Sequence, residues 1–365
     1  MLIQIIPQMP PVTSGVGDYA LALARQFRRY FGIKTYFLVG DPDWTGATAI
    51  EDFPIKKVSE RSPKALNAVL GEIVSPSATI LLHYVGYGYA TRGCPVWLVN
   101  GLQQWKMGIS AGNLVTMFHE IYAARYPFWT SAFWTAPLQK RLAANLLNIS
   151  DCVITNKPGY AEVLGKLCPG KQLKIPILPV FSSIGEPKKL LPLAERKHRL
   201  VVFGGSGNRA KVYQQSISAL KSICRELDIQ EVIDIGPPIN LPIFEINNVP
   251  IFSLGLQPAE KVSAILQDSW AGFFNYPLDF LTRSTIFAAY CAHGVIPIGT
   301  NYYAWGKEED GLEINKHYWL IDSQTKELSF AVGETIAKNA YNWYQTHNLS
   351  RQAKIFADII KNTTV

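Results

Sequence analysis

The sequence predicts an α/β protein with two doubly wound domains, each a parallel sheet covered by helices. Three observations predict this fold class. Short apolar, β-rich runs alternate with longer helical stretches, the alternation stops at a proline-rich segment near residue 170, and it then starts again. Strand, helix and strand in that rhythm form parallel sheets. The length of 365 residues also favours two hydrophobic cores over one.

The first half of the chain supplies five predicted strands. Each is a run of apolar or β-branched residues, and together they cover residues 2–6, 34–40, 79–85, 114–120 and 151–156. Helical patterns fill the intervals, for example over residues 18–31, 62–74 and 138–149. We therefore expect a first domain over residues 1–170.

The second half repeats the pattern after a predicted linker over residues 171–198, where prolines interrupt any regular element. Its predicted strands cover residues 199–207, 231–237, 249–255, 270–277, 294–300 and 318–322. Its predicted helices lie around 211–227 and at 258–268 and 284–293. We expect a second domain over 199–345 and a final helical segment over 346–365. Ligands of such sheets bind beyond the carboxyl ends of the strands, so the cleft between the two domains is the expected active site.

Composition describes a folded protein with ample core, because 48% of residues are hydrophobic and 17% are charged. Proline, glycine or a charge interrupts every apolar stretch before it could span a membrane. The opening "MLIQIIPQMPP" lacks the basic start of a secretion signal. Five scattered cysteines without zinc spacing predict free, buried thiols in a reducing compartment, so we expect a cytoplasmic protein and no metal.

The positive charge of the chain is concentrated in its first half. The net charge is +7, and residues 1–175 hold 17 Lys and Arg against 10 Asp and Glu, whereas residues 176–365 hold 18 against 18. A basic half suggests an anionic partner. Because there is no Arg or Lys run and no nucleic-acid motif, an anionic membrane surface or a phosphorylated substrate is favoured over nucleic acid.

A glycine loop follows the first predicted strand. Its core, "GVGDYA" from Gly15, matches the G-x-G-x-x-A form of the dinucleotide fingerprint. A dinucleotide fold needs a tight turn from the first strand to the first glycine. Here eight residues separate Ile6 from Gly15, so we expect the loop to project away from the sheet. Asp18 would also repel a pyrophosphate at the start of the helix. A nicotinamide-dependent oxidoreductase therefore remains an alternative, disfavoured by this loop.

Several segments resemble glycosyltransferases of family 4 and their relatives, which have the GT-B fold. They are "SGVGDYALALA", "TILLHYVGYGY", "LVTMFHEIYA", "ISDCVITNKPGYAEVL" and "KIPILPVFSSI". The resemblance implies two Rossmann-like domains facing a cleft, with a final helix crossing back to the first domain. It also implies metal-independent sugar transfer with retention of configuration. A nucleoside diphosphate sugar would be the co-substrate, with no further cofactor.

The resemblance assigns sugar or acceptor contacts to the first domain. Gly15, Val16 and Gly17 would belong to the loop that reaches donor and acceptor. His119, which ends the run "LVTMF", resembles the family's histidine near the reacting carbon of the sugar, and we expect it to be catalytic. His83 has the same placement on the preceding strand. A strand-end histidine bound only by backbone groups is the alternative for both.

A second glycine loop, "VVFGGSGNRAKVY", leaves a predicted strand directly and leads into a helix. Its free N–H groups and the helix dipole favour a phosphate. Relatives place an Arg and a Lys here on the donor diphosphate. Gly205 occupies the usual Arg position, while Arg209 and Lys211 follow shortly, so we expect these three residues at the diphosphate. Ordinary solvated charges are the alternative for Arg209 and Lys211.

The segment "NYPLDFLTRSTIFAAYCAHGVIPIG" departs from the family, because relatives carry two glutamates eight positions apart here. Ala288 or Ala289 stands at the second position, and the first has no Glu. What remains is a helix start with Arg283, Ser284 and Thr285, which suits a diphosphate. Asp279 is the nearest carboxylate for a ribose or sugar hydroxyl. A plain helix cap is the alternative for Ser284.

An aromatic stretch over residues 122–147 combines Phe128, Trp129, Phe133 and Trp134 with the cations Lys140 and Arg141. Aromatic side chains beside cations on a basic half suggest a surface that enters the lipid interface. The same side chains could line an acceptor groove or pack against a neighbouring domain.

Taken together, these residues predict a glycosyltransferase of the hexosyltransferase type. Its partners would be a nucleotide sugar donor, a lipid-linked or polysaccharide-type glycan acceptor and an anionic membrane, at whose inner face the protein would be peripheral. The alternatives are a sugar-nucleotide epimerase or phosphorylase with this fold, and a relative that binds nucleotides without catalysis. No hydrolase, P-loop or zinc-protease motif competes with these readings.

Overall fold

The computed structural model describes residues 1–12, 14–73, 78–108, 112–122, 128–170, 174–239, 244–300, 311–321 and 327–362. The chain forms two compact units. The first comprises Met1–Pro179 together with Leu349–Val365, and the second comprises Val180–Asn348. The division therefore falls inside the predicted linker 171–198.

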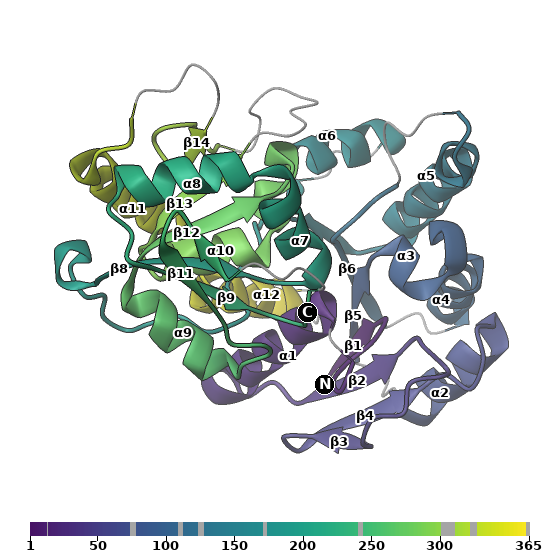
Figure 1. The fold of residues 1–365 in the computed structure, drawn as a ribbon. Helices are drawn as coiled ribbons and strands as arrows, with labels where there is room; N and C mark the ends of the chain where they lie inside the picture. The colour runs from purple at the N-terminus through teal and green to yellow at the C-terminus, as the bar shows by residue number, and fades with distance from the viewer. Residues whose placement is uncertain are drawn as a thin grey trace. The chain divides into compact units, whose positions relative to one another are not determined.

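The first unit is built on a seven-stranded sheet of order β3-β4-β2-β1-β5-β6-β7 (Figure 1). Its strands are β1 (Leu2–Ile6), β2 (Thr35–Val39), β3 (Ala49–Ile50), β4 (Phe53–Lys57), β5 (Thr79–Tyr84), β6 (Asn113–Phe118) and β7 (Cys152–Thr155). All neighbouring strands are parallel except β3, which runs antiparallel to β4. The five predicted strands are confirmed within two residues at each end.

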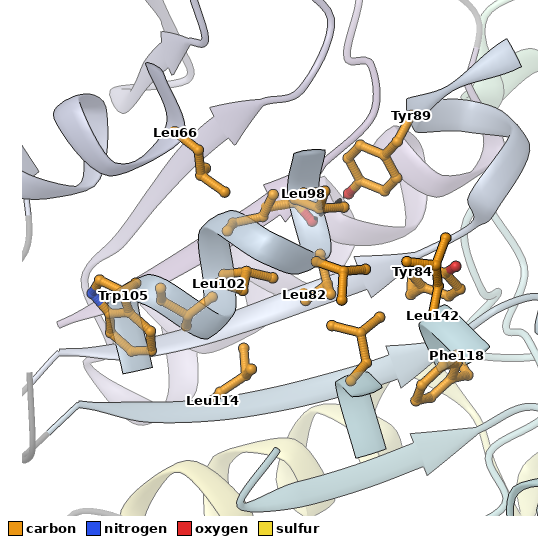
Figure 2. Close-up of a cluster of buried hydrophobic side chains, with 14 of the residues drawn as sticks. Leu66, Leu82, Tyr84, Tyr89, Leu98, Leu102, Trp105, Leu114, Phe118 and Leu142 are labelled. Carbon is orange, nitrogen blue, oxygen red and sulfur yellow. Dashed lines mark hydrogen bonds between the residues drawn. The ribbon is translucent and has the colours of Figure 1, made fainter. Parts of the chain in front are cut away.

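Helices flank this sheet. They are α1 (Gly15–Gln26), α2 (Pro63–Ile73), α3 (Gly86–Tyr89), α4 (Val96–Gly108), α5 (Ser131–Ile149), α6 (Pro158–Leu167) and α12 (Leu349–Asn362), with single turns at Phe27–Phe31 and Thr91–Gly93. Figure 2 shows leucines of β5, α4 and β6 packed together with Tyr84 and Phe118, all of them buried. Burial of this apolar surface drives the docking of the helices onto the sheet.

The second unit repeats the design with a sheet of order β10-β11-β9-β8-β12-β13-β14. Its strands are β8 (Lys197–Phe203), β9 (Glu231–Ile235), β10 (Glu245–Ile246), β11 (Val249–Ser253), β12 (Ser269–Asn275), β13 (Ile296–Thr300) and β14 (Trp319–Ile321). Its helices are α7 (Ser206–Gln215), α8 (Ile217–Glu226), α9 (Ala259–Gln267), α10 (Thr285–Ala292) and α11 (Phe330–Gln345), with single-turn or short 3-10 segments at Leu193–Glu195 and Leu278–Arg283. The single helix predicted around 211–227 is two helices that meet at Ser216, which is a correction.

Both sheets change winding direction at their first strand. In the first unit β1 lies between β2 and β5, and in the second unit β8 lies between β9 and β12. Helices that follow these strands therefore go to opposite faces and leave a crevice at the carboxyl ends. A ligand of either unit is expected at β1 and β5, or at β8 and β12.

The last helix, α12, packs within the first unit, as the predicted return of the chain requires. The Tyr19 hydroxyl on α1 donates to Gln352 Oε1 at 2.7 Å, and Gln352 Nε2 donates to the Pro179 carbonyl at 2.5 Å. Phe27 and Phe356 meet edge to face. Figure 1 shows the yellow α12 beside the purple α1. A buried polar bridge and an aromatic contact thus hold the end of the chain to its start.

The five cysteines are free thiols. Cys224 and Cys291 are buried as predicted, whereas Cys94, Cys152 and Cys168 are only half-buried, which corrects the expectation of buried thiols throughout. Among the helices of the described residues, none has both the length and the apolar character needed to cross a membrane.

Candidate active site

A pocket opens in the second unit where β8 and β12 end. Its walls come from the carboxyl ends of those strands, from α7 and from the start of α10. The lining residues are Val202, Phe203, Asn208, Arg209, Val212, Phe273, Phe274, Asn275, Tyr276, Ser284 and Ile286. The pocket therefore lies at the crevice that the strand order predicts for a ligand.

The amino terminus of α7 faces open space beside this pocket. Gly205 is the N-cap residue, and as a glycine it has no side chain to accept from the first turn. Within the described part of the chain, the N–H groups of residues 206–208 have no protein acceptor. A Cβ atom built on Gly205 or Gly207 would meet no atom within 4 Å. Uncapped N–H groups, a helix dipole and open space together suit an anion.

Gly204 lets α7 and α10 approach each other at the end of β8. Its φ of +130° lies where side chains are strained, and a Cβ atom there would come within 2.4 Å of Ile286 Cδ1. Gly236, with φ of +150°, is packed as tightly, because its Cβ atom would lie 2.1 Å from the Gly204 carbonyl oxygen. The two glycines thus allow close contacts with Ile286 and Arg209, two residues that line the pocket.

Arg209 on α7 is 1% exposed and its guanidinium bonds inside the protein. It donates from Nε to Asp234 Oδ2 at 3.0 Å, from Nη2 to Asp234 Oδ1, and from Nη1 to the Pro237 carbonyl at 2.5 Å. The interpretation of Arg209 as a solvated charge is therefore wrong. A phosphate contact by Arg209 stays a prediction. These bonds support a structural role for Arg209 in joining α7 to β9.

The Asp234 carboxylate collects further donors. The Tyr213 hydroxyl donates to Oδ2 at 2.9 Å and the Ser253 hydroxyl to Oδ1 at 3.3 Å. Burial and the neighbouring Asp234 carboxylate raise the pKa of Tyr213 well above its ordinary value, so this phenol remains a donor. The network fixes α7 against β9 behind the pocket.

Of the other predicted diphosphate residues, Ser284 lines the pocket, whereas Lys211, Arg283 and Thr285 do not. Lys211 is exposed on α7 and does not line the pocket, and Arg283 is half-buried with its guanidinium over the Phe280 ring. Ser284 lines the pocket and caps α10 by accepting from the Phe287 N–H at 3.2 Å, with Thr285 as the next residue. The capping alternative for Ser284 is thus confirmed, and a ligand contact by it stays a prediction.

Among the described residues that line this pocket, none carries a carboxylate. Asp279 lies half-buried in the short helix Leu278–Arg283 and is not one of the lining residues. Ala288 and Ala289 are buried in α10. The polar side chains that do line the pocket are two amides, two hydroxyls and Arg209, whose charge is balanced by the Asp234 carboxylate.

In the first unit, one glycine of the loop after β1 is closely packed and the other borders open space. Ser14 caps α1 by accepting from the Gly17 N–H at 3.2 Å. A Cβ atom on Gly17 would lie 2.5 Å from the Gln8 carbonyl oxygen, whereas one on Gly15 would meet nothing within 4 Å. Gly17 therefore serves close packing and Gly15 borders open space, with Val16 half-buried between them. Burial raises the pKa of Asp18 in the first turn.

The two predicted histidines of the first unit form one buried chain with Gln4 of β1. Gln4 Nε2 donates to the Ala20 carbonyl at 3.2 Å, which turns Gln4 Oε1 toward His83 Nε2 at 2.8 Å. His83 Nε2 must then carry the proton and His83 Nδ1 must accept. His83 Nδ1 lies 3.1 Å from His119 Nε2, which therefore donates. In its neutral form His119 then carries its proton on Nε2.

Burial keeps His83 neutral. His83 is fully buried, and desolvation together with the adjacent His119 holds its pKa well below the ordinary value. Both ring nitrogens of His83 are used within the protein, so we reassign it from a ligand contact to a residue that orients His119. His119 is 6% exposed and bonds to a side chain, so the alternative of backbone contacts alone is wrong for both histidines. The hydrogen-bonded series of Gln4, His83 and His119 was not predicted from the sequence, although the polar Gln4 inside the apolar run "LIQII" indicated it.

The aromatic residues at the start of α5 form an ordered surface, here called the aromatic patch. It consists of Phe128, Trp129, Phe133 and Trp134, which are 65%, 74%, 47% and 72% exposed. The rings pair edge to face, and the Trp134 indole donates to the Phe128 carbonyl at 2.8 Å. Such exposure leaves these four side chains outside the core of the first unit, and packing against a neighbouring domain stays an alternative. Residues 123–127 of the predicted stretch lie outside the described residues.

No protein-family model matches the sequence, and no curated protein matches it either. Solved structures match over nearly its whole length. An α-glucosyltransferase in complex with UDP-glucose and DNA is 12% identical, with a TM-score of 0.60 over 99% of this chain and 98% of that one. The pneumococcal O-GlcNAc transferase GtfA in complex with UDP and GlcNAc is 11% identical, with a TM-score of 0.59 over 99% and 98%.

A third match is the spinosyn forosaminyltransferase SpnP, which is 11% identical with a TM-score of 0.54 over 99% of each chain. At these identities the likeness shows the fold. The two seven-stranded α/β units are those of the GT-B fold, which confirms the predicted fold class.

Proposed function

We propose that this protein is a glycosyltransferase that moves a sugar from a nucleoside diphosphate sugar to a lipid-linked or polysaccharide-type glycan. The observation that carries the proposal is the uncapped start of α7 beside the pocket at β8 and β12, an anion site at the ligand crevice of the second unit. The solved structures that match over the whole chain include complexes with UDP-glucose and with UDP and GlcNAc. We therefore assign the second unit to the donor.

In the proposed reaction the bond from the anomeric carbon to the diphosphate oxygen breaks as an acceptor oxygen bonds to that carbon. Negative charge develops on the departing diphosphate. The N–H groups of α7 beyond Gly205, with Lys211, Arg283 and the α10 start at Ser284 and Thr285, would stabilise that charge without a metal ion. With retention of configuration, the proton of the acceptor hydroxyl passes to the departing phosphate oxygen.

His119 would orient a sugar in this scheme. The hydrogen bonds from Gln4 through His83 hold the His119 imidazole in one orientation, and an imidazole so held suits a sugar hydroxyl. Gly15, beside open space at the start of α1, would admit the acceptor without a side chain in the way. His83 then acts only by holding the imidazole of His119.

The aromatic patch supports a lipid-linked acceptor. Indole and phenyl rings that are 47% or more exposed suit the lipid interface, and the first half of the chain carries the protein's excess positive charge. We propose that the first unit binds an anionic membrane surface through the patch with Lys140 and Arg141, at the cytoplasmic face.

One observation favours a second function, that of a nucleotide-binding relative without catalysis. No carboxylate lines the pocket of the second unit within the described residues. A missing carboxylate leaves fewer groups to act on the sugar, while the anion site would still bind a nucleotide.

Thermal shift with UDP, GDP, ADP, TDP, CMP, NAD and NADP tests the proposal. We expect one nucleoside diphosphate to raise the melting temperature. The shift should shrink in Lys211→Ala and persist in Lys221→Ala, an exposed lysine on α8. Donor turnover with glycan acceptors then separates transfer from binding alone. Stabilisation by NAD or NADP only, or by no nucleotide, would contradict the proposal.

A further inference from the structure

Asn275 ends β12 and lines the pocket of the second unit. The residue is 6% exposed, so its carboxamide is held in the wall of the pocket. No sequence pattern marked it, because it stands among apolar neighbours in "GFFNYP". Buried amides in such positions need defined partners for both ends.

Two hydroxyls fix the orientation of this amide. Asn275 Nδ2 donates to Ser216 Oγ at 2.8 Å, and Ser216 Oγ lies 2.8 Å from Thr300 Oγ1. An amide nitrogen can only donate, so Ser216 Oγ must accept from it and can donate its own O–H to Thr300 Oγ1. Ser216 stands where α7 and α8 meet, and Thr300 ends β13. The bend between these two helices thus places the hydroxyl that orients Asn275.

The amide oxygen is the group left for a ligand. Because the carboxamide is planar, Oδ1 points away from Nδ2 and from Ser216. Within the described residues, no protein group donates to Asn275 Oδ1. The atom is also not among the buried side-chain atoms that lack a partner, so it remains accessible to solvent. The pocket therefore offers an acceptor at Asn275 across from the N–H donors of α7.

We propose that Asn275 Oδ1 accepts a hydrogen bond from a sugar hydroxyl adjacent to the diphosphate of the donor, and that Ser216 and Thr300 are positioning residues for it. The inference rests on the proposed function. The hydroxyl belongs either to the ribose or to the transferred sugar, which share this chemistry. A neutral acceptor also fits the place, because a carboxylate would repel the diphosphate bound at α7.

Calorimetric titration of UDP and UDP-glucose into the full chain tests this assignment. We expect Asn275→Ala to weaken binding about 3- to 10-fold, as for loss of one hydrogen bond. Asn275→Asp should weaken it further by charge repulsion. Thr300→Val should weaken binding while Thr300→Ser retains it, a rescue that loss of packing would not produce. The control is Asn339→Ala on α11, outside the pocket.

Each outcome decides between the possibilities. Equal weakening for UDP and UDP-glucose supports a ribose hydroxyl, and weakening for UDP-glucose alone supports the transferred sugar. Unchanged binding of both by a folded Asn275→Ala variant overturns the inference and leaves the proposed function standing. If the wild-type protein binds neither probe, a UDP-sugar donor is wrong, and the same titration with the nucleoside diphosphate that raises the melting temperature decides the assignment; binding of no nucleoside diphosphate overturns the proposed function and this assignment together. Melting temperatures without ligand show that each variant is folded.

Discussion

Replacing Asp234 with Asn removes the counter-charge of a fully buried guanidinium. Asp234 is 2% exposed, and its carboxylate accepts from Arg209, Tyr213 and Ser253. Asn keeps the shape and one acceptor but carries no charge. The Arg209 cation would then remain buried without compensation, because its further acceptor, the Pro237 carbonyl, is neutral.

Breaking a buried ion pair in this way costs about 3–5 kcal/mol, a large share of the roughly 5–15 kcal/mol that stabilises a domain. We expect the free energy of unfolding of the second unit, measured by urea denaturation, to fall by that amount. Circular dichroism and tryptophan fluorescence follow it, and the slope of free energy against urea should stay constant.

Two comparisons make this result interpretable. The double variant Arg209→Met, Asp234→Leu removes both charges and should lose less stability than Asp234→Asn alone. Asp228→Asn changes an aspartate whose side chain is 83% exposed and should cost less than about 0.5 kcal/mol. A loss below about 1 kcal/mol for Asp234→Asn, or a double variant less stable than the single one, would refute the reasoning.

Three further predictions concern other parts of the chain. Because the pKa of His83 is lowered, the unfolded chain takes up a proton below about pH 6.5 that the folded first unit does not, so its stability should fall by up to about 1.4 kcal/mol per pH unit below that value. Urea melts should show the decline, and His83→Gln should flatten it; a pH-independent wild type would contradict this. Gly204→Ala should lower both stability and nucleotide affinity, with partial recovery on adding Ile286→Ala, since strain at φ +130° persists. Trp129→Ala with Trp134→Ala should reduce sedimentation with phosphatidylglycerol vesicles several-fold while leaving nucleotide thermal shifts intact, and equal sedimentation would remove the patch from the proposal.

Most of the fold could be predicted from the pattern of apolar residues along the sequence. Runs such as "TILLHY" and "LVTMF" are buried on both faces of a parallel sheet, so their continuous hydrophobicity was visible without knowing their neighbours. β4 was missed because only Phe53 and Ile55 face the core, while Pro54 and two lysines face solvent. The break at Ser216 was missed because the helical pattern continues across it.

The site was less predictable, because pairing in space is invisible in local patterns. The glycines at 204, 205 and 207 predicted an anion site from their place between a strand and a helix, and of these three Gly204 has a positive φ that favours glycine. Nothing in the sequence linked Arg209 to Asp234, or Asn275 to Ser216 and Thr300, since these partners come from different strands and helices. The carboxamide of Gln4 likewise gains its meaning only from His83 on a neighbouring strand.

The bond between Tyr19 and Gln352 joins residues 333 positions apart. During synthesis on a ribosome, the first unit therefore waits for its last helix until the whole second unit has emerged. Until then the surface that α12 will cover, on α1 and on the following turn at Phe27, stays open to water or to chaperones. A recombinant version of the first unit alone would need residues 349–365 rejoined behind Pro179, for instance by a short glycine-rich connection, to be complete.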